Sequence, residues 1–126
     1  MKKKVYYAHS VALYNTPQEE RDIATLEKLN LEVFNPNQQK LQDEFNEQKQ
    51  HDYVLAFEQV FLHSIQECDV FAFRALPDGR IPGGVAKELV YAQEQGKTII
   101  ELPVNIIRRS MEVDETREFL EEIGQR

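Results

Sequence analysis

The stretch RIPGGVAKELVYAQEQGKTIIELP, from Arg80 to Pro103, passes from a glycine pair through a charged segment to an apolar run. Gly83-Gly84 begins a predicted helix, Gly96 follows its end, and the apolar residues after it are typical of a buried strand. A helix that leads into an apolar strand is typical of proteins with parallel sheets. Glu88 lies about one helical turn after the glycine pair. The role of this carboxylate is the main question that the sequence raises.

The rest of the chain continues the alternation of strands and helices. Thr16-Pro17 predicts a helix start, because a capping threonine precedes a proline at the first helical position. Residues 37 to 52 are almost entirely polar, and we expect a mobile segment with about one helical turn there. The predicted strands are residues 4–8, 31–34, 68–73 and 97–102, and the predicted helices are residues 17–29, 53–66, 83–95 and about 114–123.

This order predicts an α/β fold in a single domain of residues 1–126. We expect a small doubly wound parallel sheet of four to five strands flanked by helices, as in flavodoxin-like and Rossmann-like folds. Ligands of such folds bind beyond the carboxyl ends of the strands, where the strand order reverses. Three segments should therefore meet at that edge: Tyr6 to Tyr14, Asn35 to Gln39, and Arg74 to Gly84.

Composition excludes several classes of function. The net charge of −7 argues against a nucleic-acid polymer as partner, although a small phosphorylated ligand stays possible. No apolar run approaches the roughly 20 residues of a membrane span, so no membrane partner is expected. The basic start, MKKKVYYAHS, makes a poor signal peptide, and the single Cys68 suits a reduced, cytoplasmic protein. The three histidines lack metal-ligand spacing, and we expect neither a metal nor a cofactor.

The residues around Glu88 allow two explanations of that carboxylate. A glutamate near a helix start complements the helix dipole and needs no function. The same position after Gly83-Gly84 also suits catalysis, because a glycine pair at a helix start brings free N–H groups close to an anionic ligand.

The run Glu88-Leu89-Val90-Tyr91-Ala92, followed by Gln95-Gly96-Lys97 and an apolar strand, resembles the nucleophile motif of the nucleoside 2-deoxyribosyltransferase family. In that family a Glu-Leu-x-x-Ala run ends in Gly-Lys before a strand, a glycine lies four residues before the glutamate, and the first strand carries an aromatic residue. Gly84 and Tyr6 stand at the last two of these positions. The resemblance covers roughly residues 4–103, and its specific part is about twenty residues.

The resemblance implies cleavage of an N-glycosidic bond with retention, with Glu88 as nucleophile and Tyr6 as the residue that orients it. Tyr6 is equally consistent with a core pair with Tyr7. The family also has an aspartate that assists the leaving base, and this chain has Phe61 there. Glu58, three residues earlier, is a candidate replacement, although a glutamate beside a core stripe also reaches water easily.

The expected ligand is a small-molecule nucleoside or nucleotide. The candidate substrate-binding residues are His9, Ser10, Arg74, Gly83 and Gly84, with Arg74 as a partner for phosphate and Arg80 more typical of surface salt bridges. The family also implies a homo-oligomer, for which the surplus apolar residues 60–62 offer indirect support.

Two classes of function stay open from the sequence. The first is an enzyme that either transfers deoxyribose between bases or hydrolyses a (deoxy)nucleoside or its 5′-monophosphate. The second is a non-catalytic nucleotide-binding protein, which Phe61 in place of the acid favours.

Overall fold

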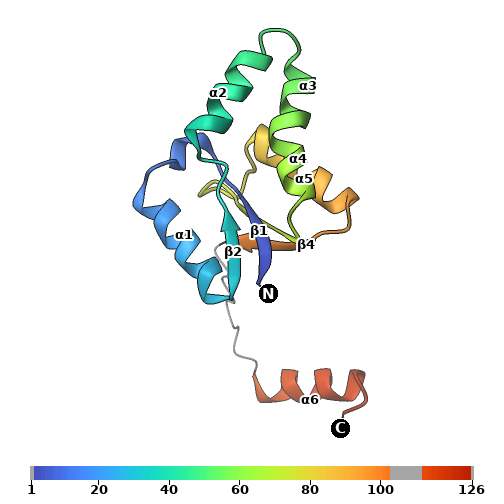
Figure 1. The fold of residues 1–126 in the computed structure, drawn as a ribbon. Helices are drawn as coiled ribbons and strands as arrows, with labels where there is room; N and C mark the ends of the chain where they lie inside the picture. Colours follow the sequence, from blue (N-terminus) through green and yellow to red (C-terminus); the bar gives the residue numbers. More distant parts are fainter. Residues whose placement is uncertain (1, 103–111, 126) are drawn as a thin grey trace.

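The computed structural model describes residues 2–102 and 112–125, so Pro103 at the end of the opening stretch lies outside the described residues. Within these residues four strands form one parallel sheet with helices on both faces (Figure 1). The strand order is β2-β1-β3-β4, which reverses between β1 and β3 and confirms the predicted doubly wound α/β class. The strands are β1 (Lys3–Ala8), β2 (Leu31–Phe34), β3 (Val70–Arg74) and β4 (Thr98–Leu102).

The helices follow the local signals of the sequence. Thr16 caps α1, because its hydroxyl oxygen accepts the backbone N–H of Glu19 at 3.4 Å, and Asn30 ends that unit with a left-handed φ of 63°. Gly96, with φ of 70°, lets the chain turn from α5 into β4. The helices are α1 (Pro17–Lys28), α2 (Gln39–Gln48), α3 (Tyr53–Phe57), α4 (His63–Gln66), α5 (Gly83–Glu94) and α6 (Val113–Glu122), with a 3₁₀ turn η1 (Val11–Leu13) and a π-helical turn η2 (Glu58–Leu62).

The polar segment 37–52 differs from its prediction. Instead of a mobile segment with about one helical turn, it contains α2, a helix of 10 residues. Leu41 and Phe45 lie one turn apart on α2 and pack against the buried cluster of Phe57, Val60 and Phe61. Tertiary packing of these two side chains stabilises a helix that its polar composition alone does not predict.

The sheet separates two apolar cores. Successive side chains of a strand point to opposite faces, so Tyr6 and Ala8 of β1 pack under α4 and α5, whereas Val5 and Tyr7 pack with Leu26 of α1. Both tyrosines are fully buried. The predicted helix 53–66 is continuous from α3 through η2 to α4, and it covers the same face as α5 (Figure 1).

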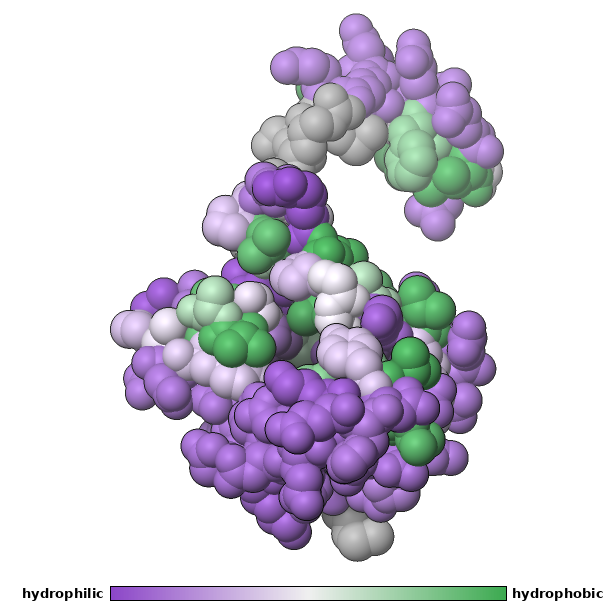
Figure 2. All heavy atoms as spheres, turned by 90° about the horizontal axis from the view of Figure 1, so that it is seen from above, coloured by the Kyte–Doolittle hydropathy of each residue, from purple (hydrophilic) through white to green (hydrophobic). Residues whose placement is uncertain are grey.

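The carboxy-terminal helix α6 has an apolar side that faces solvent. Figure 2 shows hydrophobic atoms gathered on one side of α6, while most of the body seen in that view is hydrophilic. Val113, Phe119 and Ile123 are the exposed large apolar residues of this segment. No helix in residues 2–102 or 112–125 has both the length and the apolar character needed to cross a membrane.

Candidate functional site

A cavity of about 310 Å³ lies beyond the carboxyl end of β1, at the place where the strand order reverses. This is the position that doubly wound folds use for ligands, and the volume is at the lower end of the range for small-molecule sites. The lining comes from the loop after β1, from α2, from the helical run 53–61 and from the start of α5. It consists of Tyr6, His9, Ser10, Val11, Tyr14, Pro36, Gln42, Phe45, Tyr53, Phe57, Phe61, Pro82, Gly84, Val85 and Glu88.

Glu88 and Tyr6 meet at this cavity. The Tyr6 hydroxyl donates a hydrogen bond to Oε2 of Glu88, although the two residues lie 82 positions apart in the chain. Burial raises the pKa of Glu88 from 4.5 to about 7, and the hydrogen bond from Tyr6 works in the opposite direction and lowers it. Burial and the nearby Glu88 raise the pKa of Tyr6 well above 10, so the tyrosine keeps its proton.

The aromatic ring of Tyr6 is fixed from both sides. Phe34 of β2 and Phe71 of β3 stack on it with ring centroids 5.6 Å and 5.9 Å away. Tyr6 is therefore a core residue and a partner of Glu88 at once, but it forms no core pair with Tyr7, which packs on the other face of the sheet. A ring held in this way presents its hydroxyl group to Glu88 in one orientation.

One wall of the cavity is aromatic. Phe45 of α2 lies 5.1 Å from Phe61 between ring centroids, and Phe57 lies 5.5 Å from Phe61. Tyr53 contacts Phe45 edge to face at 5.5 Å. Aromatic faces of this kind stack well on planar rings, so the wall suits a ligand with a flat heterocycle. Phe61 itself lines the cavity.

His9 and Ser10 lie at the cavity as the sequence predicts. Nδ1 of His9 is 3.1 Å from the Tyr7 carbonyl oxygen, and Nε2 is 2.7 Å from Oε2 of Glu19. The Tyr7 carbonyl and the Glu19 carboxylate are both acceptors, and the two contacts fix the orientation of the ring. Burial raises the pKa of Glu19, but hydrogen bonds from His9, from the Asn15 N–H and from Asn37 outweigh burial and lower it.

Only one residue of the glycine pair lies at the cavity. Gly84 lines the cavity, and Gly83 does not. A Cβ at Gly84 would lie 4.0 Å from the Phe57 ring, and one at Gly83 would meet nothing within 4 Å. The protein's own packing therefore does not require glycine at either position. Space for a ligand at the start of α5 is a remaining reason for Gly84.

Arg74 is not at the cavity, which corrects the expectation that it binds the ligand. Its Nε and Nη2 atoms donate to Asp22 at 2.6 and 2.7 Å, and Asp22 is buried on α1. Because Phe73 pairs with Ala8 on the Glu88 side, Arg74 points to the opposite face of the sheet. Burial raises the pKa of Asp22, while hydrogen bonds from Arg74 and Tyr7 lower it below its usual value.

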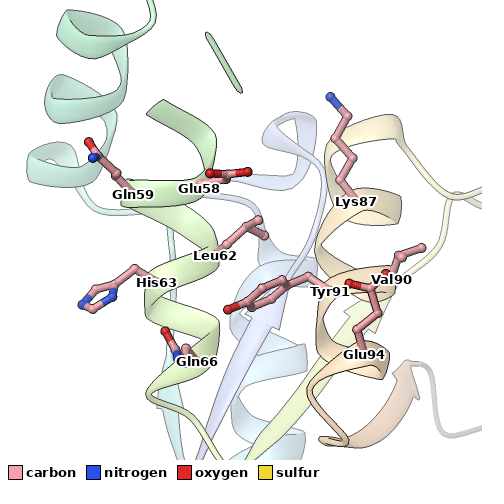
Figure 3. A pocket seen from close by; sticks show the side chains of 9 residues that line it. All are labelled: Glu58, Gln59, Leu62, His63, Gln66, Lys87, Val90, Tyr91 and Glu94. Atoms are coloured by element: carbon pink, nitrogen blue, oxygen red, sulfur yellow. The ribbon is translucent and has the colours of Figure 1, made fainter. Parts of the chain in front are cut away.

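Glu58 also lies elsewhere than expected. It is exposed and lines a separate, open groove between the run 53–66 and α5, across from Lys87 (Figure 3). The π-helical turn that begins at Glu58 has more residues per turn than an α-helix, so positions 58 and 61 diverge and only Phe61 reaches the cavity. This groove is larger, about 790 Å³, but its carboxylates face solvent, and we assign the site to the cavity with buried Glu88.

Other sequence-based candidates are accounted for by packing. Val60 and Phe61 are buried within the chain itself, so they provide no apolar surplus for an interface. Burial raises the pKa of the Cys68 thiol to about 11, which keeps it protonated and unreactive at neutral pH. Among residues 2–102 and 112–125, no cluster of three or more His, Cys, Asp or Glu side chains is arranged to hold a metal ion.

Sequence reasoning missed several residues of the cavity, among them Tyr14, Gln42 and Phe45. Tyr14 belongs to the loop after β1, which the sequence placed at the ligand edge without assigning this side chain a role. Gln42 and Phe45 are on α2, where a polar segment was expected. Their i, i+3 spacing is the only signal that points to one face of a helix.

Comparison of the chain with models of protein families and with curated protein sequences finds no match. The resemblance to the nucleoside 2-deoxyribosyltransferase family therefore rests on the motif residues in the chain.

Proposed function

We propose that this chain cleaves or transfers at the N-glycosidic bond of a (deoxy)nucleoside or nucleoside 5′-monophosphate, with Glu88 as the nucleophile. The observation that carries the proposal is the buried hydrogen bond between Tyr6 and Glu88 in an aromatic-lined cavity. A glutamate that only complements a helix dipole does not need a buried tyrosine partner. A nucleophile does, because its orientation toward the reacting carbon decides the rate.

The chemistry follows from the two side chains. The Glu88 carboxylate attacks the anomeric carbon of the sugar as the bond to the base breaks, and the electron pair of that bond goes to the base. Water or a second base then displaces Glu88, so that the configuration at the anomeric carbon is retained. With a pKa of about 7, Glu88 is substantially ionised at neutral pH and is a stronger nucleophile than an ordinary carboxylate.

The lining of the cavity favours a nucleoside over a nucleotide. Its residues include no lysine or arginine, and Arg74 is neutralised by Asp22 on the other face of the sheet. A phosphate would depend on the Ser10 hydroxyl and on the N–H groups at the start of α5. Both ligand types belong in the test, with the deoxynucleoside expected to react faster.

The direct test is release of free base. Each deoxynucleoside and each nucleoside 5′-monophosphate is incubated with the protein, with and without a second base, and the products are separated by chromatography. Product sugar identifies a hydrolase, and a new nucleoside identifies a transferase. Glu88→Gln should abolish turnover, whereas Glu58→Gln, which changes an exposed glutamate outside the cavity, should retain it.

A covalent intermediate provides an independent check on Glu88. A 2′-fluorinated nucleoside slows breakdown of the sugar ester, so the modified peptide accumulates. Mass spectrometry should then find the added sugar on Glu88. A modified residue other than Glu88 would contradict the site assignment even if base is released.

The second candidate is a non-catalytic nucleotide-binding protein. Phe61 favours it, because an apolar ring lines the cavity at the family's acid position. Calorimetric binding of a nucleoside or nucleotide without any release of base would support this candidate and contradict the first.

A homo-oligomer in the cytoplasm remains part of the proposal. Val54, Leu55 and Val90 are exposed apolar side chains, in contrast to Val60 and Phe61. Sedimentation velocity on the purified protein tests it, and a single monomeric species across micromolar concentrations would exclude stable self-association.

A further inference from the structure

Tyr14 differs from the two buried tyrosines in what its hydroxyl group contacts. Tyr6 donates to Glu88, and Tyr7 donates to Asp22 at 2.5 Å. Tyr14 lines the same cavity as Glu88, and its hydroxyl oxygen accepts a hydrogen bond from the Gln42 side chain, which leaves the hydroxyl hydrogen for another partner. The hydroxyl group of Tyr14 is therefore available to a ligand.

The loop after β1 holds Tyr14 in place. The turn η1 is capped by Ser10, whose hydroxyl oxygen accepts the Ala12 N–H at 3.2 Å, and the Tyr14 N–H donates to the Val11 carbonyl at 3.0 Å. Asn15, next in the chain, adopts a left-handed φ of 61°, and its N–H donates to Glu19 at 3.2 Å. A side chain on a turn that is held by these hydrogen bonds is preorganised for a ligand.

Further contacts hold the ring of Tyr14 and the end of the same loop in place. The His9 ring lies 4.9 Å from the Tyr14 ring between centroids. Asn37, from the loop after β2, donates to the side chain of Asn15 at 3.0 Å and to both oxygens of Glu19. The positions of two loops at the ligand edge, those after β1 and β2, thus depend on one buried carboxylate.

Tyr14 shares the cavity with Glu88, and its surroundings keep its hydroxyl group protonated. Burial raises its pKa to about 12, and the negative charges of Glu88 and Glu19 add to this, while the Gln42 side chain acts in the opposite direction. Tyr14 therefore keeps its proton at neutral pH and acts as a hydrogen-bond donor. Phe61, on another wall of the cavity, has no proton to donate.

We propose that Tyr14 donates a hydrogen bond to the departing base and so supplies the assistance that Phe61 cannot give. The inference rests on the proposed function. As the Glu88 carboxylate bonds to the anomeric carbon, the glycosidic electron pair and a negative charge move onto the base. The Tyr14 O–H stabilises that charge at an edge atom of the base, and the free base takes up its proton from water.

Tyr14→Phe tests this role with pairs of substrates that differ in their need for a proton. For purines the pair is 2′-deoxyguanosine and its 7-methylated cation, whose base leaves neutral. For pyrimidines it is 2′-deoxyuridine and the 5-fluoro derivative, whose base is the better leaving group. We expect kcat to fall about 100-fold on the ordinary substrate and no more than about threefold on the activated one.

Tyr91→Phe is the matched control, because it removes the same oxygen from a tyrosine of α5 that lines the separate groove and not the cavity. It should leave both rates nearly unchanged. Equal losses on both substrates with Tyr14→Phe, or no loss, would overturn the inference while the proposed function stands. A wild-type protein that releases no base from any substrate would instead overturn the proposed function, and this inference with it.

Discussion

Tyr6 and Tyr7 are neighbours in β1, and their hydroxyl groups donate hydrogen bonds to carboxylates on opposite faces of the sheet. Tyr6 contacts Glu88 of α5 at the cavity, and Tyr7 contacts Asp22 of α1, which also binds Arg74. Both side chains are fully buried. The two tyrosines thus allow the same substitution to be made once at the candidate site and once in a structural ion-pair network.

Tyr6→Phe should shift the pH dependence of catalysis. The Tyr6 hydrogen bond lowers the pKa of Glu88, so its loss moves that pKa above about 7. In the proposed function the carboxylate is the nucleophile, so the rising part of the profile of kcat/KM against pH should move to higher pH and activity at pH 7 should fall. Tyr7→Phe should lower the free energy of unfolding by about 1–2 kcal/mol but leave the pH dependence of kcat/KM unchanged. A shift with Tyr7→Phe and none with Tyr6→Phe would contradict the assignment.

Glu88→Gln should make the protein inactive and, above neutral pH, more stable. The folded protein holds the Glu88 proton more tightly than the unfolded chain, because the folded pKa of about 7 exceeds 4.5. The free energy of unfolding therefore falls as pH rises from 4.5 to about 7. Glutamine does not ionise, so the variant does not lose this stability. We expect its free energy of unfolding to exceed that of the wild type by about 1–3 kcal/mol at pH 8.

Chemical denaturation at two pH values measures this gain. At pH 4 the wild type carries a protonated Glu88, so the difference between the two proteins should nearly vanish. A variant that is less stable than wild type at pH 8 would show that the ionised carboxylate stabilises the fold, contrary to the expected cost of its burial.

Arg74→Met should destabilise the protein and have little effect on ligand affinity. It leaves Asp22 buried without its charged partner, which we expect to cost about 2–4 kcal/mol. The pKa of Asp22 is lowered in the folded state. The stability that its ion pair with Arg74 contributes is therefore present above pH 3.8 and disappears as pH falls through the lower pKa of the folded protein.

The matched control for Arg74 is Arg80→Met. Arg80 forms an exposed pair with Asp78, and its loss should change stability by no more than about 0.5 kcal/mol. A large loss of nucleotide affinity with Arg74→Met, without a loss of stability, would restore the original expectation that Arg74 binds phosphate.

Gly84→Ala should weaken ligand binding without weakening the fold. The added methyl group makes only an ordinary contact with Phe57, and alanine in a helix stabilises by up to about 1 kcal/mol. Gly83→Ala is the control, since it adds the same methyl group in open space outside the cavity. Calorimetric titration of both variants measures the difference, and equal affinities would show that no ligand approaches the backbone at Gly84.

Local patterns predicted most of the fold. The capping residues of α1, the glycine after α5 and the apolar periodicity of 53–66 each act within a few residues, so a single sequence displays them. The helix α2 escaped prediction because its stability comes from Leu41 and Phe45 against Phe57 and Phe61, and no local signal encodes that contact.

The candidate site was predicted in part. Glu88, Tyr6, His9, Ser10 and Gly84 do line one cavity. Gly83, Arg74 and Glu58 do not, and for Arg74 and Glu58 the reason is a side-chain direction. Strand alternation turns Arg74 toward Asp22, and a π-helical turn separates Glu58 from the position of Phe61.

The stretch from Gly83 to the strand after Gly96 was sufficient to predict a parallel α/β fold and to single out Glu88, because helix starts, helix ends and apolar runs are properties of neighbouring residues. The partner of Glu88 was decided only in three dimensions. Tyr6 reaches it across 82 positions because parallel pairing sets β1 beside β3 and α5 packs over both. The same packing buries the carboxylate, and burial, a property of the folded chain alone, raises its pKa into the range useful for catalysis.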